Sequence, residues 1–203
     1  MSDFYNHIFL QNRIFAHIHY RTKTNCQMKY IVTLFLIVPQ LCFAQLTKQD
    51  SLWLRFKHFI GPWKGTGEGV DGKGTYERTY QFALNKKYIQ VKNKTIYAPT
   101  KEKPKGYVHE DFGVISYDKM RNTFVFRQFH IEGFVNQYVL ESISADGKII
   151  VFVTESIENI PKGWRCRETY TVNGANEISE AFDMAEPGKD LESYTKASFT
   201  KSK

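Results

Sequence analysis

The stretch that decides the fold reads Phe59-Ile60-Gly61-Pro62-Trp63-Lys64-Gly65-Thr66-Gly67-Glu68-Gly69 and runs on to Gly74. Repeated glycines in a strand leave one face without side chains, which marks a sharp bend or a close approach by another backbone. A small barrel needs both features where its first strand begins. We therefore predict that this stretch opens a β-barrel, with the indole of Trp63 plugging one end.

Two partial nucleotide-binding motifs occur in the same residues. Gly67-x-Gly69-x-x-Gly72 matches a dinucleotide fingerprint, and with Lys73 the glycines match most of a phosphate-binding loop. Both motifs need a helix directly after the glycines, because the helix N-terminus binds the phosphate. Residues 75–82 instead alternate with period two and are rich in β-formers. The sequence therefore favours a strand over either nucleotide site.

Strand-like runs continue to the C-terminus, separated by turn formers such as Asp71-Gly72, Asp146-Gly147 and Asn173-Gly174. An apolar face in residues 50–59 predicts one short helix before them. Because closure removes unpaired edges, we predict an all-β fold: a ten-stranded antiparallel up-and-down barrel, lipocalin- or calycin-like, with a short N-terminal helix. The strands are predicted near residues 62–70, 74–83, 88–97, 107–117, 122–130, 135–143, 148–156, 164–172, 176–184 and 190–200.

The N-terminal region has the pattern of a secretory signal peptide in residues 28–44. A basic start at Met28-Lys29 precedes an apolar run that ends with Ala44 at the cleavage position. The run is shorter than the about 20 residues of a membrane span, although a retained membrane anchor is the alternative. Residues 1–27 are interpreted as an upstream extension from a mis-assigned start codon. We expect an exported protein, periplasmic or secreted, with residues 45–203 as a single β-barrel domain and no stable membrane insertion.

Composition excludes some partners. The 203 residues carry a formal net charge of +7, but no stripe of basic and aromatic residues forms a nucleic-acid-binding module. Cys166 is the only cysteine after residue 44, so no intrachain disulfide is expected there, and a buried structural role is favoured. The charged, proline-bearing segment 98–106 is expected to flank the mouth of a cavity.

Side-chain alternation places His109 and Asp111 on one face of a strand, and Phe126 and His130 together on the next. If these faces point inward, the lumen is aromatic with a few polar groups, as in small-molecule sites. No catalytic constellation or metal-ligand spacing is recognised, and an internal hydrogen-bonded pair is the favoured role of His109 and Asp111. The candidate ligand-binding residues of the lumen are Trp63, Tyr76, Tyr80, His109, Asp111, Phe126, His130 and Tyr194.

The opening stretch resembles the Gly-x-Trp-x-Gly-x-Gly-x-Gly motif of the nitrobindins, and His109-x-Asp111-x-Gly113 is similar to their His-x-Glu-x-Gly. Near the C-terminus, the spacing of Met184-Ala185 and residues 191–201 is similar to their closing strand. The resemblance implies a ten-stranded calycin-like barrel that holds haem and acts on nitric oxide and peroxynitrite. The family's iron ligand is a histidine in the last strand. Tyr194 occupies the matching position here, so Tyr194 or His109 would lie near a haem iron.

Three functional hypotheses follow. The first is an exported barrel that binds a small apolar or amphipathic molecule in its lumen, without catalysis. The second is a haem-binding, nitrobindin-like barrel, in which haem is the one cofactor considered. The third is a barrel filled by its own aromatic side chains, which acts through its surface.

Overall fold

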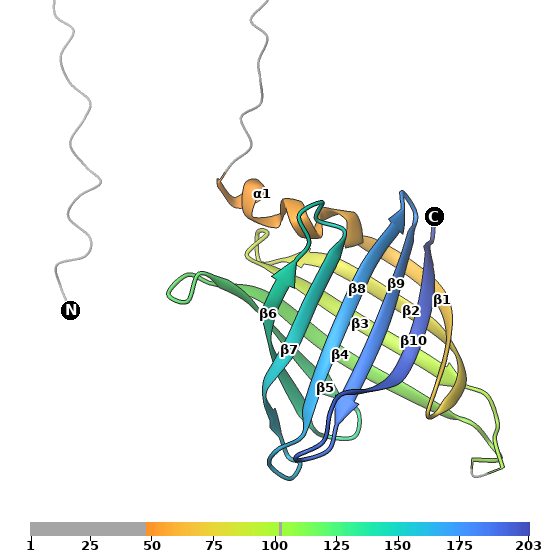
Figure 1. Ribbon diagram of the computed structural model, residues 1–203. Helices are drawn as coiled ribbons and strands as arrows, with labels where there is room; N and C mark the ends of the chain where they lie inside the picture. Colours follow the sequence, from red (N-terminus) through yellow and green to blue (C-terminus); the bar gives the residue numbers. More distant parts are fainter. Residues whose placement is uncertain (1–47, 102) are drawn as a thin grey trace, which may run out of the picture. The chain divides into compact units, whose positions relative to one another are not determined.

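The computed structural model describes residues 48–203 except residue 102. The proposed extension in residues 1–27 and the proposed signal peptide in residues 28–44 lie outside the described residues. Within them, a short helical segment precedes ten strands (Figure 1). The elements are α1 (Lys48–Trp53), the 3₁₀ helix η1 (Leu54–Phe59), β1 (Gly61–Gly69), β2 (Gly72–Ala83), β3 (Tyr88–Tyr97), β4 (Tyr107–Asp118), β5 (Thr123–His130), β6 (Val135–Ile143), β7 (Ile149–Glu158), β8 (Arg165–Gly174), β9 (Glu177–Ala185) and β10 (Glu192–Lys201).

Each strand pairs antiparallel with the next, and β1 also pairs with β10, so the sheet closes into an up-and-down barrel. The predicted fold class is therefore confirmed. The predicted strand bounds agree with the observed ones to within about two residues, because glycine, asparagine and aspartate mark the turns. The predicted short N-terminal helix is also confirmed, and it consists of α1 followed directly by η1. Neither described helix is long and apolar enough to cross a membrane.

The glycines of β1 let the first and last strands close the barrel. A Cβ atom on Gly67 would lie 2.6 Å from the carbonyl oxygen of Lys196 and 2.9 Å from the Cβ atom of Ala197. A Cβ atom on Gly65 would likewise clash with the carbonyl oxygen of Ser198. The predicted close approach of another backbone is thus confirmed, and β10 supplies that backbone.

The helical segment covers one end of the barrel with aromatic side chains (Figure 1). Trp53 packs against Phe124, with ring centroids 5.4 Å apart, and its Nε1 donates a hydrogen bond of 2.7 Å to the carbonyl oxygen of Lys86. Trp63 is buried below, and its Nε1 donates a hydrogen bond of 2.6 Å to the carbonyl oxygen of Phe59. The predicted plug therefore exists, with the helical residues and Trp63 forming it together.

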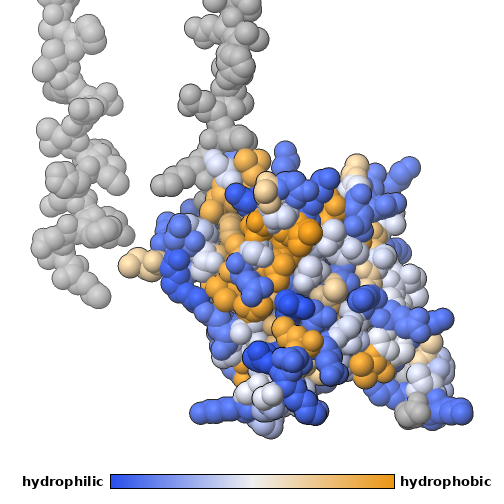
Figure 2. Space-filling model, viewed as in Figure 1, coloured by the Kyte–Doolittle hydropathy of each residue, from blue (hydrophilic) through white to orange (hydrophobic). Residues whose placement is uncertain are grey.

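The interior has an apolar half and a polar half. Near the helical segment the lumen is packed with apolar side chains, among them Ile89, Ile115, Phe126, Ile150 and Phe152. Buried polar side chains lie in the strands further from it, among them Arg78, Asn93, Gln128, Asn136 and Glu168. On the face drawn in Figure 2, hydrophilic side chains surround an apolar area that lies over β6 and β7, below α1. The polar half of the interior is where the candidate site lies.

Candidate functional site

The polar half of the lumen contains a cavity of about 570 Å³. The loops that border it, between β1 and β2 and between β3 and β4, lie at the end of the barrel opposite α1 (Figure 1). Its volume falls in the range of about 300–1,000 Å³ typical of small-molecule sites. One wall is apolar and is formed by Phe134, Ile157, Ile160, Trp164, Phe182 and Met184.

An ion pair and two tyrosines border the cavity near its mouth. Lys103 Nζ lies 3.0 Å from Asp71 Oδ1, and the hydroxyl of Tyr194 donates a hydrogen bond of 2.8 Å to Asp71 Oδ2. Burial opposes ionisation of Asp71, but hydrogen bonds from Tyr194 and Lys103 outweigh it and hold the pKa of Asp71 below its usual value. The Lys103 ammonium also lies 3.8 Å from the centroid of the Tyr107 ring. Segment 98–106 thus contributes Lys103 to the cavity wall, as the sequence predicts.

A buried charged cluster forms the inner part of the cavity. Arg78 Nη1 lies 2.8 Å from Glu180 Oε1, and Arg78 Nη2 donates a hydrogen bond of 2.9 Å to Glu180 Oε2. The Nε of Arg78 donates to Asn93 Oδ1. Glu168, beside Glu180, is only 5% exposed. Burial and then the neighbouring Glu180 raise the pKa of Glu168 well above its usual value, so this carboxyl group is protonated and neutral well above pH 4.5.

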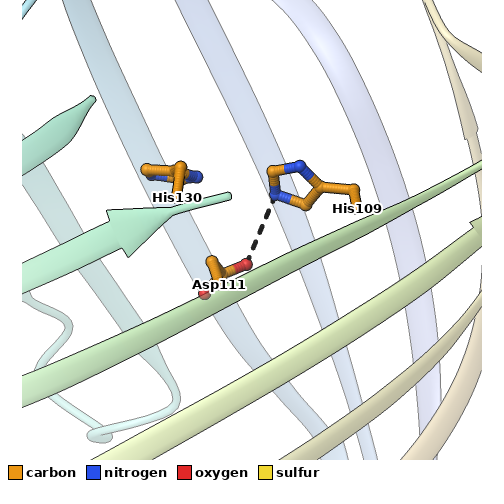
Figure 3. Close-up of side chains that lie close together, drawn as sticks. All are labelled: His109, Asp111 and His130. Carbon is orange, nitrogen blue, oxygen red and sulfur yellow. Dashed lines mark ion pairs between the residues drawn. The ribbon is translucent and has the colours of Figure 1, made fainter. Parts of the chain in front are cut away.

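A second cluster joins β4 to β5 and the turn that follows (Figure 3). His109 Nε2 lies 3.6 Å from Asp111 Oδ2, and His109 Nδ1 lies 2.9 Å from Glu132 Oε1. Burial lowers the pKa of His109, but the two carboxylates outweigh it and raise that pKa to about 9. Burial lowers the pKa of His130 to about 4, so its imidazole is neutral at pH 7. The two histidines therefore differ in charge although their ring centroids are 5.5 Å apart.

Hydrogen bonds fix the Asp111 carboxylate in this cluster. Asn93 Nδ2 and Gln128 Nε2 donate to Asp111 Oδ1 over 2.7 Å and 2.9 Å. Burial raises the pKa of Asp111, but the hydrogen bonds from His109 and Gln128 outweigh it and keep the carboxyl group ionised at neutral pH. Asn93 also accepts from Arg78, so it connects the two polar clusters.

The structure brings five of the eight candidate residues together. The five that line the cavity are Tyr76, His109, Asp111, His130 and Tyr194. Trp63, Tyr80 and Phe126 also point inward, but they belong to the packed core beside the cavity. The sequence did not decide which face of this strand points inward, and the structure does. His109 and Asp111 point into the lumen, whereas Phe112, the residue after Asp111, is 39% exposed on the outer face.

Sequence reasoning missed Arg78, Glu132, Glu168 and Glu180. The alternation that selected Tyr76 and Tyr80 also places Arg78 inward, because it lies between them at the same period. Its partner Glu180 could not be found this way, since alternation gives the face of a strand and not the partner across the lumen. Glu132 lies in a turn, where no periodicity applies.

Several buried polar atoms of the described residues have no hydrogen-bond partner within the protein. Five of these six atoms belong to residues that line the cavity: Tyr76 Oη, Gln128 Oε1, His130 Nδ1, Asn136 Oδ1 and Glu168 Oε2. A buried polar group without a partner costs about 1–3 kcal/mol. These atoms belong to side chains around one cavity, where water or a polar group of another molecule can supply the missing partner.

Comparison with known proteins supports the fold and does not identify a family. No protein-family model matches the chain, and no curated protein matches it. Among solved structures, Rv2717c from M. tuberculosis is similar over 74% of this chain and 97% of its own, with a TM-score of 0.58 and 18% sequence identity. A redesigned β-barrel and a de novo fluorescence-activating β-barrel align with TM-scores of 0.39 and 0.37. The likeness to Rv2717c supports the barrel fold, and the nitrobindin family itself is not shown.

The expected haem ligands are both engaged in other contacts. The Tyr194 hydroxyl donates to Asp71, and both ring nitrogens of His109 lie beside carboxylates. His130 is different, because its Nδ1 has no hydrogen-bond partner. As a haem ligand, His130 would bond through Nδ1 in the tautomer that carries the ring proton on Nε2.

Proposed function

We propose that the barrel binds one small amphipathic molecule in its lumen. The observation that carries this proposal is the cavity of about 570 Å³, with one apolar wall and convergent buried polar groups. An apolar body would lie against the wall that includes Ile157 and Trp164, and a polar end would reach the unpartnered atoms of Asn136 and Glu168. This division of apolar and polar surface is typical of sites for amphipathic ligands.

The charges around the cavity favour a ligand that is neutral or cationic at its polar end. The acidic side chains that line it include Asp71, Asp111, Glu132 and Glu180, whereas the basic ones Arg78, Lys103 and His109 each lie within 4 Å of one of these carboxylates. The guanidinium of Arg78 is already bound to Glu180 and Asn93, so it is not free to pair with a ligand carboxylate. Bringing a further anion into a buried site without a free cation is costly.

The experiment uses N-phenyl-1-naphthylamine, a neutral probe whose emission rises in apolar surroundings. We expect its emission to rise on mixing with the folded protein and to saturate at one probe per chain. Ile157→Trp fills part of the cavity and should reduce the signal, whereas Ser156→Trp, on the exposed face of the same strand, should not. No rise with the folded protein, or equal binding by the two variants, would contradict the proposal.

A second candidate is haem binding, as the family resemblance implies. The observation that favours it is the neutral imidazole of His130, which lines the cavity and has an unpartnered Nδ1. Haem would supply redox and nitrogen-oxide chemistry when bound, with His130 as its protein ligand. Titration with ferric haem should then give a saturable Soret band that persists in Tyr194→Phe and is lost in His130→Ala. A flat titration of the unmodified protein would exclude this candidate.

A further inference from the structure

His109, Asp111 and His130 form a compact group of potential metal ligands. The three side chains come from paired strands, because Asp111 of β4 lies opposite His130 of β5 in the sheet register. One ligand atom from each residue lies within 4.8 Å of those of the other two. Figure 3 shows the three side chains close together, with the His109 ring directed toward the Asp111 carboxylate.

Outer contacts hold His109 and Asp111 in the way that metal ligands are usually held. Glu132 Oε1 lies 2.9 Å from His109 Nδ1, which leaves Nε2 directed toward Asp111 Oδ2. Asn93 and Gln128 occupy the other carboxylate oxygen, Oδ1. A carboxylate on the far nitrogen of a histidine and hydrogen bonds to a ligating carboxylate are regular features of metal sites.

The His130 ring is fixed without full use of its nitrogens. It stacks on Phe134 with ring centroids 4.1 Å apart and an interplanar angle of 19°. Its Nε2 lies 3.2 Å from Asn136 Nδ2, whereas its Nδ1 has no partner within the protein. His130 can bond to a metal ion through Nδ1 in the tautomer that carries its proton on Nε2, with the Asn136 amide turned so that its Oδ1 accepts that proton.

The distances suit a small transition-metal ion. Zn²⁺ bonds to nitrogen and oxygen of about 2.0–2.2 Å place the ligand atoms of a tetrahedral site about 3.4 Å apart. The observed 3.6 Å between His109 Nε2 and Asp111 Oδ2 matches this value, and small side-chain rotations bring in the third ligand from within 4.8 Å. Two imidazoles with one carboxylate suit Zn²⁺ and its neighbours better than Mg²⁺ or Ca²⁺, which prefer all-oxygen sites.

We propose that His109, Asp111 and His130 bind one divalent transition-metal ion of the Zn²⁺ type, with its fourth coordination position open to the lumen. Three protein ligands and one open position distinguish such a site from a closed structural one. The inference does not depend on the proposed amphipathic ligand. It adds a Lewis acid that an oxygen or nitrogen atom of a bound molecule can reach.

The experiment uses Co²⁺ as a spectroscopic probe and Zn²⁺ as its competitor. In the full chain used for this experiment, three histidines outside the described residues are replaced by alanine: His7, His17 and His19. These N-terminal side chains then cannot bind the probe. We expect one Co²⁺ per chain, with the intense visible bands of a tetrahedral ion, and their loss when Zn²⁺ is added. His130→Ala should abolish the bands, and His58→Ala, which removes a half-buried histidine elsewhere, should leave them unchanged.

Glu132→Gln provides a variant that does not threaten the fold, because the Glu132 side chain is 45% exposed. Loss of the Glu132 carboxylate should weaken Zn²⁺ affinity about 10–100-fold, which is the usual effect of removing a group that holds a metal ligand in place. Circular dichroism of each variant checks that the barrel is intact. If the unmodified site gives only a weak octahedral Co²⁺ spectrum, or if His130→Ala binds Zn²⁺ equally well, the cluster is an ion-paired network only and the proposal is wrong.

Discussion

Replacing Glu168 by glutamine should change how stability depends on pH. Glu168 lies in the polar half of the lumen and is 5% exposed, and burial raises the pKa of its carboxyl group well above the usual 4.5. Below pH 4.5 the group is protonated in both the folded and the unfolded chain. As the pH rises further, only the unfolded chain ionises, so the unfolded state gains free energy and the stability of the folded protein falls. Glutamine cannot ionise, and the variant escapes this loss.

The expected size follows from proton linkage. For each pH unit above 4.5 over which Glu168 stays protonated in the folded state, the stability difference between Glu168→Gln and the unmodified protein grows by about 1.4 kcal/mol. For a chain of this size, that corresponds to a rise of roughly 3–5 °C per pH unit in the difference between the two melting temperatures. The growth ends where the pH reaches the pKa of Glu168 in the folded state.

The assay is thermal unfolding followed by circular dichroism, from pH 4 to pH 8, with both proteins in the same buffers. Glu177→Gln is the matched control, because Glu177 lies on the exposed side of β9 and its carboxyl group is in water whether the chain is folded or not. A melting-temperature difference that stays constant with pH would refute the reasoning. A difference that shrinks as the pH rises would show that Glu168 is ionised in the folded protein and paired with Arg78.

Three further outcomes test the barrel itself. Gly67→Ala should lower the free energy of unfolding by about 1–3 kcal/mol in chemical denaturation, because its methyl group meets the carbonyl oxygen of Lys196 at 2.6 Å; unchanged stability would refute the closure argument. Trp63→Phe leaves the buried carbonyl oxygen of Phe59 without its donor and opens a small void in the core, so it should cost about 1–3 kcal/mol in the same measurement. Cys166 is buried, which raises its pKa to about 12, so peptide mass spectrometry should find it unlabelled by a thiol reagent at pH 8 in the folded protein and labelled after denaturation. Rapid labelling of the folded protein would show that Cys166 is accessible.

The strand pattern could be predicted from sequence because it depends on local chemistry. Turn residues such as Asp146-Gly147 fix where strands end, and period-two alternation fixes which residues share a face. The same local rule selected Tyr76, His109 and His130 as candidates for the lumen, and all three line the cavity. Where the rule assigned a face correctly, as for Phe126, it could not tell a packed position from a cavity wall, since that depends on the volume of the side chains opposite.

The partners within the site could not be predicted, because they come from distant parts of the chain. Arg78 and Glu180 are 102 residues apart and lie on β2 and β9, which are not neighbours in the sheet. Tyr194 and Asp71 are 123 residues apart and meet only because β10 closes on β1. Such pairs depend on how the barrel closes and on the register between its strands. A single sequence specifies neither of these directly.

The polar half of the lumen is hard to explain by stability alone. Taking charged groups out of water costs several kcal/mol per ion, and buried ion pairs such as Arg78 and Glu180 recover this only with good geometry and further hydrogen bonds. The apolar half shows that the same barrel can fill its interior with side chains such as Phe126 and Phe152. Local departures from the rules of a stable core are expected at functional sites. In the described residues, five of the six buried polar atoms without a protein partner belong to side chains that line one cavity, and this placement supports the proposed binding site there.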